Sequence, residues 1–123
     1  FSNFKKIKSV GKTKKEINDL VSLADDLEKA GSKLIVLECI SLEASKIITN
    51  KLSIPTIGIG SSKYCDGQVL VIDDILNLNS IERKPKYVKS FTNLEIIIKS
   101  AVKRFTIEVK NKKFPSKKQS YLL

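Results

Sequence analysis

The sequence contains no histidine, no methionine and no tryptophan among its 123 residues. Without histidine, the chain itself cannot hold a serine–histidine–aspartate triad or a histidine-bound zinc site. Its two cysteines, Cys39 and Cys65, are too few for a disulfide framework, which favours reduced thiols inside a cell. No stretch approaches the ~18 consecutive apolar residues of a membrane span, and the basic segment 1–13 lacks the apolar core of a signal peptide. We therefore expect a cytoplasmic protein without a membrane partner.

Positive charge is concentrated at the two ends of the chain, although the net charge is +10. Residues 1–10 hold three lysines and no acidic side chain, and residues 81–123 hold twelve basic and three acidic side chains. Residues 11–80, by contrast, hold eight basic and ten acidic ones. A basic tail can bind nucleic acid or an anionic membrane. Because aromatic residues do not interleave this one as they do in single-strand binders, we expect solvated lysines and no nucleic-acid partner.

Amphipathic helices are predicted at three places. The first covers residues 13–30, where Thr13 and Glu16 form a T-x-x-E capping box and Gly31 stands at the C′ position. The second begins at Ser41 and ends before Pro55, where a helix cannot easily continue. The third follows a capping box of Thr92 and Glu95 and ends by Phe114 and Pro115, with residues 116–123 frayed. Residues 77–90 are polar and basic and are predicted to form a long loop.

Short apolar runs lie between these helices, at residues 34–37, 56–60 and 69–72. Continuous apolar runs of this length are typical of strands buried in a parallel sheet. Strands that alternate with amphipathic helices predict an α/β fold of parallel βα units. Three such strands cannot close a (β/α)₈ TIM barrel, which takes ~250 residues. Residues 1–123 are therefore predicted to form one partial barrel domain, about half of a barrel.

The working residues of parallel α/β folds lie just past the carboxyl ends of the strands. Glu38 ends the first apolar run, so we expect it to be partly buried, and burial would raise its pKa and suit it as a general base. The alternative is a glutamate that caps a loop or pairs with a lysine, and position alone does not separate the two. Asp73 and Asp74 follow the third run, and on a strand they would face opposite sides.

The second run leads into further candidates for a ligand-binding loop. Gly58 and Gly60 would allow a ligand or a backbone to come close, although a glycine pair more often starts a turn. Asp66 could orient a ligand, but Asp66-Gly67 is also an ordinary turn signal. A third glycine, which a dinucleotide-binding fingerprint requires, is missing after Gly60.

Several ordered strings resemble the ketopantoate hydroxymethyltransferase family. Pro55-Thr56-Ile57-Gly58-Ile59-Gly60 followed by Cys65-Asp66-Gly67-Gln68-Val69-Leu70-Val71 is similar to its signature stretch, and Val36-Leu37-Glu38-Cys39-Ile40 to its catalytic strand end. Gly11-Lys12-Thr13, Pro85-Lys86-Tyr87-Val88-Lys89 and Phe114-Pro115 match further landmarks in order and spacing. The resemblance covers about residues 8–121, and it corresponds to the C-terminal half of the family's barrel.

The resemblance implies a specific reaction. Family members transfer the methylene group of 5,10-methylenetetrahydrofolate to 3-methyl-2-oxobutanoate and form 2-dehydropantoate, on the way to pantothenate and coenzyme A. Mg²⁺ holds the keto acid, and the enzymes assemble into large homo-oligomers such as decamers. Glu38 falls on the family's general base. The expected partners are thus the small-molecule keto acid, the folate and further copies of the protein.

The resemblance also implies what this chain lacks. The family's metal ligands and its substrate-binding serine and lysine lie in the N-terminal half, so no metal ligand is expected within residues 1–123. Because the chain opens with Phe1 and contains no methionine, we expect a processed or partial protein. We expect it to be inactive alone and, with open strand edges, prone to aggregate.

The sequence departs from the family pattern at a few positions and leaves other functions open. Ser61-Ser62 replace Ala-Gly, and Ser41, Asp73 and Gln119 replace a proline and two histidines, which would also fit a non-catalytic remnant. A carbon–carbon lyase of the related phosphoenolpyruvate mutase and isocitrate lyase group would keep the barrel, although the stretch 65–68 favours the transferase. A basic nucleic-acid-binding module would differ from both through affinity that falls steeply with salt.

Overall fold

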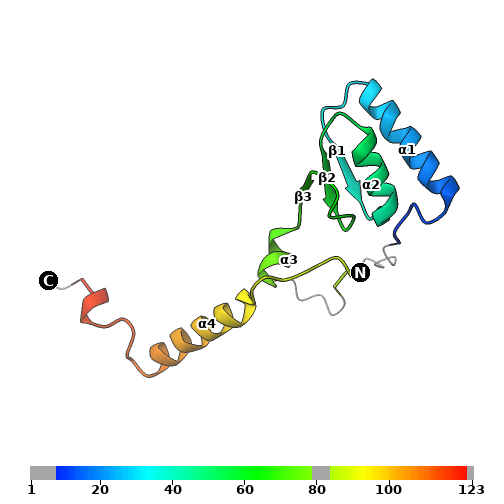
Figure 1. Ribbon diagram of the computed structural model, residues 1–123. Helices are drawn as coiled ribbons and strands as arrows, with labels where there is room; N and C mark the ends of the chain where they lie inside the picture. Colours follow the sequence, from blue (N-terminus) through cyan, green and yellow to red (C-terminus); the bar gives the residue numbers. More distant parts are fainter. Residues whose placement is uncertain (1–7, 79–83, 122–123) are drawn as a thin grey trace. The chain divides into compact units, whose positions relative to one another are not determined.

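The computed structural model describes residues 8–78 and 84–121 and has the α/β architecture expected from the sequence (Figure 1). Within this range the chain divides into two compact units, residues 8–71 with 84–88 and residues 72–78 with 89–121. The first unit carries a three-stranded parallel sheet and two helices, and the second is helical. The single domain expected over residues 1–123 stays a prediction. Part of the expected loop at 77–90, residues 79–83, lies outside the described residues.

Helix α1 spans Lys14–Lys29 and confirms the first predicted helix. Thr13 is its N-cap: the Thr13 hydroxyl accepts from the Glu16 N–H at 3.2 Å, and the Glu16 carboxylate accepts from the Thr13 N–H at 3.4 Å. Two backbone donors at the helix start are thereby satisfied reciprocally. Gly31 follows the last turn with φ at +101°, a left-handed conformation that glycine adopts without steric cost.

The sheet contains β1 (Ile35–Glu38), β2 (Thr56–Ile59) and β3 (Gly67–Gln68) in the order β1-β2-β3, all parallel. The carboxyl ends of β1 and β2 are level, because Glu38 pairs with Ile59. On the other side of β1, Val10 forms a parallel bridge with Ile40. This isolated bridge lies two residues past the end of β1.

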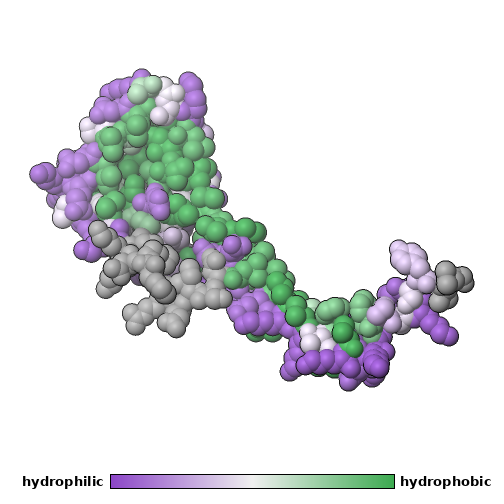
Figure 2. Space-filling model, turned by 180° about the vertical axis from the view of Figure 1, so that it is seen from behind, coloured by the Kyte–Doolittle hydropathy of each residue, from purple (hydrophilic) through white to green (hydrophobic). Residues whose placement is uncertain are grey.

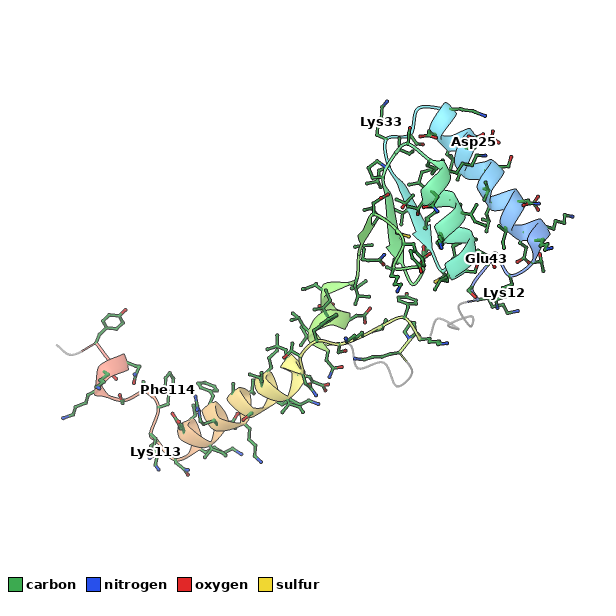
Figure 3. The ribbon with its side chains drawn as sticks, viewed as in Figure 1. Lys12, Asp25, Lys33, Glu43, Lys113 and Phe114 are labelled. Atoms are coloured by element: carbon green, nitrogen blue, oxygen red, sulfur yellow. The ribbon has the colours of Figure 1, made fainter. Side chains whose placement is uncertain are left out.

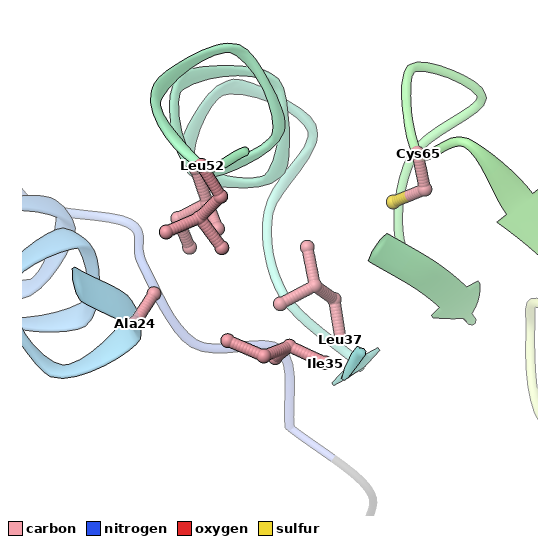
Figure 4. Close-up of a cluster of buried hydrophobic side chains, with 6 residues drawn as sticks. Ala24, Ile35, Leu37, Leu52 and Cys65 are labelled. Carbon is pink, nitrogen blue, oxygen red and sulfur yellow. The ribbon is translucent and has the colours of Figure 1, made fainter. Parts of the chain in front are cut away.

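Helix α2 spans Leu42–Lys51, and Ser41 caps it by accepting a hydrogen bond from the Ala44 N–H at 3.3 Å. One face of β1 packs against both helices and forms the core shown in Figure 4. Ile48 of α2 is 1% exposed and Leu37 of β1 is 2% exposed. The cluster comprises Ala24, Ile35, Leu37, Ile48, Leu52 and Cys65. Burial of these apolar side chains is the main contribution to the stability of this unit.

The opposite face of β1 is open. Val36 alternates with the core residues and is 54% exposed, and Leu34, Val69 and Val71 are about as exposed. Figure 2 shows a broad hydrophobic area on the strand-bearing unit as seen from behind. An exposed apolar area of this kind marks a surface that is normally covered. No helix among residues 8–78 and 84–121 is long and apolar enough to cross a membrane.

The third strand differs from its prediction. We expected it at residues 69–72, but β3 pairs Gly67 with Ile57 and Gln68 with Gly58. The ladder ends where the Val69 N–H donates to the Gly58 carbonyl at 3.0 Å. Helix α3 then begins at Ile72 and runs to Leu76. Of the apolar run predicted as a strand, residues 69–71 thus lie outside any strand or helix, and Ile72 starts a helix.

The second unit contains α3, α4 (Leu94–Lys110) and a 3₁₀ helix at Lys117–Gln119. The cap of α4 is Asn93, whose side chain accepts from the Ile96 N–H at 3.4 Å, so the capping box predicted from Thr92 is wrong. The tail that we expected to be frayed is capped by Ser116 and Gln119. No residue of α4 is buried, and the Phe105 ring meets that of Phe114, labelled in Figure 3, edge-on at 5.4 Å.

Candidate active site

Glu38 occupies the last position of β1, at the carboxyl edge of the sheet. It shares the open face with Val36, because side chains alternate along a strand. Our expectation of partial burial is wrong for this chain, since Glu38 is exposed. The reason is that the helices cover only the face that carries Leu37. A carboxylate on the open face is free to meet a ligand that lies over the strand ends.

Cys39 turns the chain immediately after Glu38. Its φ is +52°, a left-handed conformation that non-glycine residues rarely adopt. Its N–H donates to the Ile59 carbonyl at 2.9 Å, and its carbonyl accepts from the Val10 N–H at 3.0 Å. The thiol is buried, and this burial, followed by the neighbouring negative charge of Glu38, raises the pKa of Cys39. Hydrogen bonds on both sides thus fix the turn that follows the candidate base.

A group of serine hydroxyls lies beneath this turn. Ser61, two residues past the end of β2, lies 3.2 Å from the Ile40 carbonyl and within hydrogen-bond distance of the Ser45 hydroxyl. Ser45 of α2 is 0% exposed and lies 2.8 Å from the Ser41 carbonyl. Because each hydroxyl carries one proton, only two of these three contacts are hydrogen bonds at any moment. The Ser41 hydroxyl in turn donates to the Gly11 carbonyl at 2.5 Å. These bonds connect the ends of β1 and β2 to the first turns of α2.

Gly58 lies under the side chain of Gln68. A Cβ placed on Gly58 would stand 2.9 Å from both side-chain polar atoms of Gln68 and 3.1 Å from the sulfur of Cys65. The Gln68 amide uses that space to donate to the Ser62 carbonyl at 2.8 Å. The glycine is therefore required by packing of the β2–β3 connection, whereas its suggested part in ligand binding stays a prediction.

Gly60 directly follows β2, with φ at +61°, and is covered by Tyr87. A Cβ on Gly60 would lie 2.6 Å from a ring carbon of Tyr87, which is closer than van der Waals contact allows. The Pro85–Lys89 landmark thus supplies an aromatic ring to the carboxyl edge of the sheet. Gly60 and Glu38 lie at the same edge, because Ile59 pairs with Glu38.

Asp66 lies at the other end of β2. Its carboxylate accepts from the Thr56 N–H at 2.8 Å and from the Thr56 hydroxyl at 3.1 Å, and these bonds hold the pKa of Asp66 below its usual value. Thr56 begins β2 and Ile59 ends it, so the two are roughly 10 Å apart along the strand. Asp66 therefore anchors the amino end of β2, away from Glu38.

Asp73 and Asp74 are not at a strand end. Both belong to the first turn of α3, and Asp74 is buried there. The reasoning that placed them on opposite faces of a strand is thus wrong. Among residues 8–78 and 84–121 no group of three or more His, Cys, Asp or Glu side chains could hold a metal ion. The described residues therefore do not by themselves fit a magnesium site.

The structure brings Glu38, Cys39, Gly60, Ser61 and Tyr87 to one edge of the sheet. Sequence reasoning had named Glu38 and Gly60 as site candidates, but it missed the roles of Ser45 and Tyr87. The spacing of Ser41 and Ser45 placed both hydroxyls on one side of a helix, and this signal could have found the pair. Nothing local in the sequence could have found the contact of Tyr87 with Gly60, because 27 positions separate them.

Comparison with known proteins agrees with this arrangement. The family model of ketopantoate hydroxymethyltransferase matches residues 1–117. The chain belongs to this family. It is 50% identical over 111 residues to the 3-methyl-2-oxobutanoate hydroxymethyltransferase of Clostridium botulinum strain 657, a match that covers 90% of this chain. It is 47% identical over 110 residues, 89% of the chain, to the protein of the same name from Saccharolobus islandicus strain L.S.2.15.

The family is one of transferase enzymes, as the names of these relatives state. The chain spans about 40% of the length of either relative. The three-stranded parallel sheet is consistent with part of the barrel that we expected.

Proposed function

We propose that this chain supplies the general base of a 3-methyl-2-oxobutanoate hydroxymethyltransferase and forms the C-terminal part of its (β/α)₈ barrel. The observation that carries the proposal is the place of Glu38, exposed at the carboxyl edge of a parallel sheet, where enzymes of this architecture hold their working groups. The match over residues 1–117 supports the same reaction. The open face of β1 then corresponds to the interior of the barrel.

The proposed step is removal of the proton at C3 of the keto acid. The Glu38 carboxylate takes this proton, and the electron pair of the C–H bond moves toward the keto oxygen to form an enolate. Water adds to the methylene carbon of 5,10-methylenetetrahydrofolate, and both of its C–N bonds break to release tetrahydrofolate and formaldehyde. The enolate carbon then bonds to the formaldehyde carbon, and the formaldehyde oxygen takes up a proton to become the hydroxyl of the product. The product is 2-dehydropantoate, an intermediate on the route to pantothenate.

Other parts of the reaction belong to residues outside this chain. When bound, Mg²⁺ would stabilise negative charge on the keto oxygen, but the described residues form no cluster for it, so no step here depends on the metal. We propose that the remaining barrel supplies the metal ligands and that the chain alone is inactive. The proposed partners are the keto acid, the folate and further copies of the protein, with the cytoplasm as the setting.

The test joins the full chain, at Phe1, to the part of the Clostridium botulinum relative that it does not match. Proton exchange at C3 of 3-methyl-2-oxobutanoate in D₂O and formation of 2-dehydropantoate with folate are then measured in the parent fusion protein and in Glu38→Gln. Loss of a general base predicts a decrease of about 10²-fold or more in both rates. Glu43→Gln is the matched control, because Glu43 is exposed in the first turn of α2, labelled in Figure 3.

The outcomes distinguish an error in the proposed activity from an error in the assignment of Glu38 as the general base. An active parent whose activity survives Glu38→Gln would keep the transferase and remove Glu38 as its base. A fusion protein that folds but shows neither exchange nor product would contradict the proposed activity. Turnover by the 123-residue chain alone would show that the rest of the barrel is not needed.

A further inference from the structure

The segment that carries Glu38 is held from three directions. Behind Glu38, the Cys39 N–H donates to the Ile59 carbonyl at 2.9 Å. On the other side, the Ser41 N–H donates to the Val10 carbonyl at 2.8 Å. From below, the Ser61 hydroxyl donates to the Ile40 carbonyl at 3.2 Å. The last of these is the only side-chain contact of the three, so it is the one that a substitution can remove.

Such a restraint matters because the turn is in an uncommon conformation. A left-handed residue other than glycine, as at Cys39, persists only when its surroundings favour it over the ordinary conformation. If the bonds to residues 39–41 weaken, the turn can relax, and the last strand position moves with it. Glu38 is that position, so the direction of its carboxylate depends on the turn.

We propose that Ser61 and Ser45 are positioning residues for Glu38, acting through the Ile40 carbonyl, an inference that rests on the proposed function of this site. Ser61 contacts both the Ile40 carbonyl and the Ser45 hydroxyl. When the Ser45 hydroxyl donates to Ser61, the Ser61 proton remains available for the Ile40 carbonyl, and because Ser45 is 0% exposed water cannot readily replace this donor.

The amino end of β2 provides a matched control. There Thr49 of α2 bonds the hydroxyl of Thr56 at 2.8 Å, so a second pair of hydroxyls connects α2 to β2. Thr49→Val removes one hydroxyl of this pair and preserves the shape of the side chain. Because Thr56 begins β2 and Glu38 lies beside its end, Thr49→Val should lower stability without moving the carboxylate.

The test measures kcat and KM for C3 proton exchange in the parent fusion protein and its variants. Ser61→Ala is expected to lower kcat about tenfold with KM unchanged, because misplacement of a base slows proton transfer more than substrate binding. Ser61→Thr, which keeps the hydroxyl, is expected to restore kcat. Thr49→Val is expected to match the parent in kcat. Ser45→Ala, a second variant that removes the other hydroxyl, is expected to lower kcat in the same way as Ser61→Ala.

The inference is overturned if Ser61→Ala or Ser45→Ala keeps the kcat of Thr49→Val, or if the loss falls on KM alone. A loss of kcat that Ser61→Thr does not restore also counts against it. These results differ from failure of the proposed function, in which the parent itself shows no exchange and both proposals are lost together.

Discussion

The carboxylate of Asp66 accepts two hydrogen bonds from Thr56, one from the backbone N–H at 2.8 Å and one from the hydroxyl at 3.1 Å. The Asp66 N–H returns a bond to the same hydroxyl at 3.3 Å. The loop after β2 is thereby tied back to the residue that begins β2, and this allows a parallel third strand to follow without an intervening helix.

The first prediction concerns acid stability. The bonds from Thr56 stabilise the charged form of Asp66 in the folded chain, so its pKa is lower there than in the unfolded chain. This contribution to the free energy of unfolding is therefore complete above the unfolded pKa of about 3.9 and is lost as the pH falls through the folded value. Asp66→Asn is expected to lower the unfolding temperature near neutral pH and to flatten its decrease in acid. Circular dichroism at a series of pH values measures both, and an equally steep decrease in the variant would contradict the prediction.

The second prediction compares two costs of replacing a glycine by alanine, the strain of a left-handed backbone and a steric clash of the added Cβ. Gly31 and Gly60 both have positive φ, at +101° and +61°. A Cβ on Gly31 meets nothing within 4 Å, so Gly31→Ala should cost only the left-handed penalty of about 1–2 kcal/mol. A Cβ on Gly60 meets the Tyr87 ring at 2.6 Å, so Gly60→Ala should cost about 1–3 kcal/mol more. Urea unfolding of both variants provides the comparison.

A double-mutant cycle tests the cause of that difference. In a Tyr87→Ala background, Gly60→Ala should cost no more than Gly31→Ala, because the ring that it meets is gone. An unchanged cost in that background would exclude Tyr87 as the reason that Gly60 is a glycine.

Local signals in the sequence predicted much of the first unit. Both ends of α1 were predicted correctly, its start from the capping box of Thr13 and Glu16 and its end from Gly31 at the C′ position. Each of these signals depends only on neighbouring residues. The apolar runs placed β1 and β2 to within a residue for the same reason. The third strand was misplaced because its bounds depend on the Gly58 carbonyl, a partner that propensity does not reveal.

The candidate site was less predictable, since it depends on contacts distant in sequence. Glu38 was located correctly at a strand end but was wrongly expected to be partly buried, because the described helices cover only the opposite face of β1. Asp66 was placed near the working edge because it follows β2 in sequence, whereas its bonds to Thr56 bring it to the opposite end. The hydrogen bond between the hydroxyls of Ser45 and Ser61 connects α2 to the residues after β2, and no pattern within either segment predicts it.

The third prediction uses Cys39 to report on the charge of Glu38. Burial raises the pKa of the Cys39 thiol, and the neighbouring carboxylate raises it further because a nearby negative charge disfavours the thiolate. Glu38→Gln removes that charge, so the thiol pKa should fall toward its usual value and alkylation by iodoacetamide should begin at lower pH. The measurement is made with Cys65→Ala present in both proteins, so that only one thiol reacts. An identical pH profile with Glu or Gln at position 38 would show that the carboxylate does not influence the thiol.

The last prediction compares the two faces of β1. Leu37 is 2% exposed against the helices, so in the isolated chain Leu37→Ala should cost about 2–5 kcal/mol or unfold it outright. Its neighbour Val36 is 54% exposed, so Val36→Ala should change the free energy of unfolding by no more than about 0.5 kcal/mol. If the open face is the inside of a barrel, the fusion protein should bury Val36, and the same substitution should then cost about 1–3 kcal/mol.

Urea unfolding of both variants, in the isolated chain and in the fusion protein, gives the four values. An equally small cost of Val36→Ala in the fusion protein would mean that the remaining part of the relative does not pack on this face, and that the sheet seen here is not closed into a barrel by it.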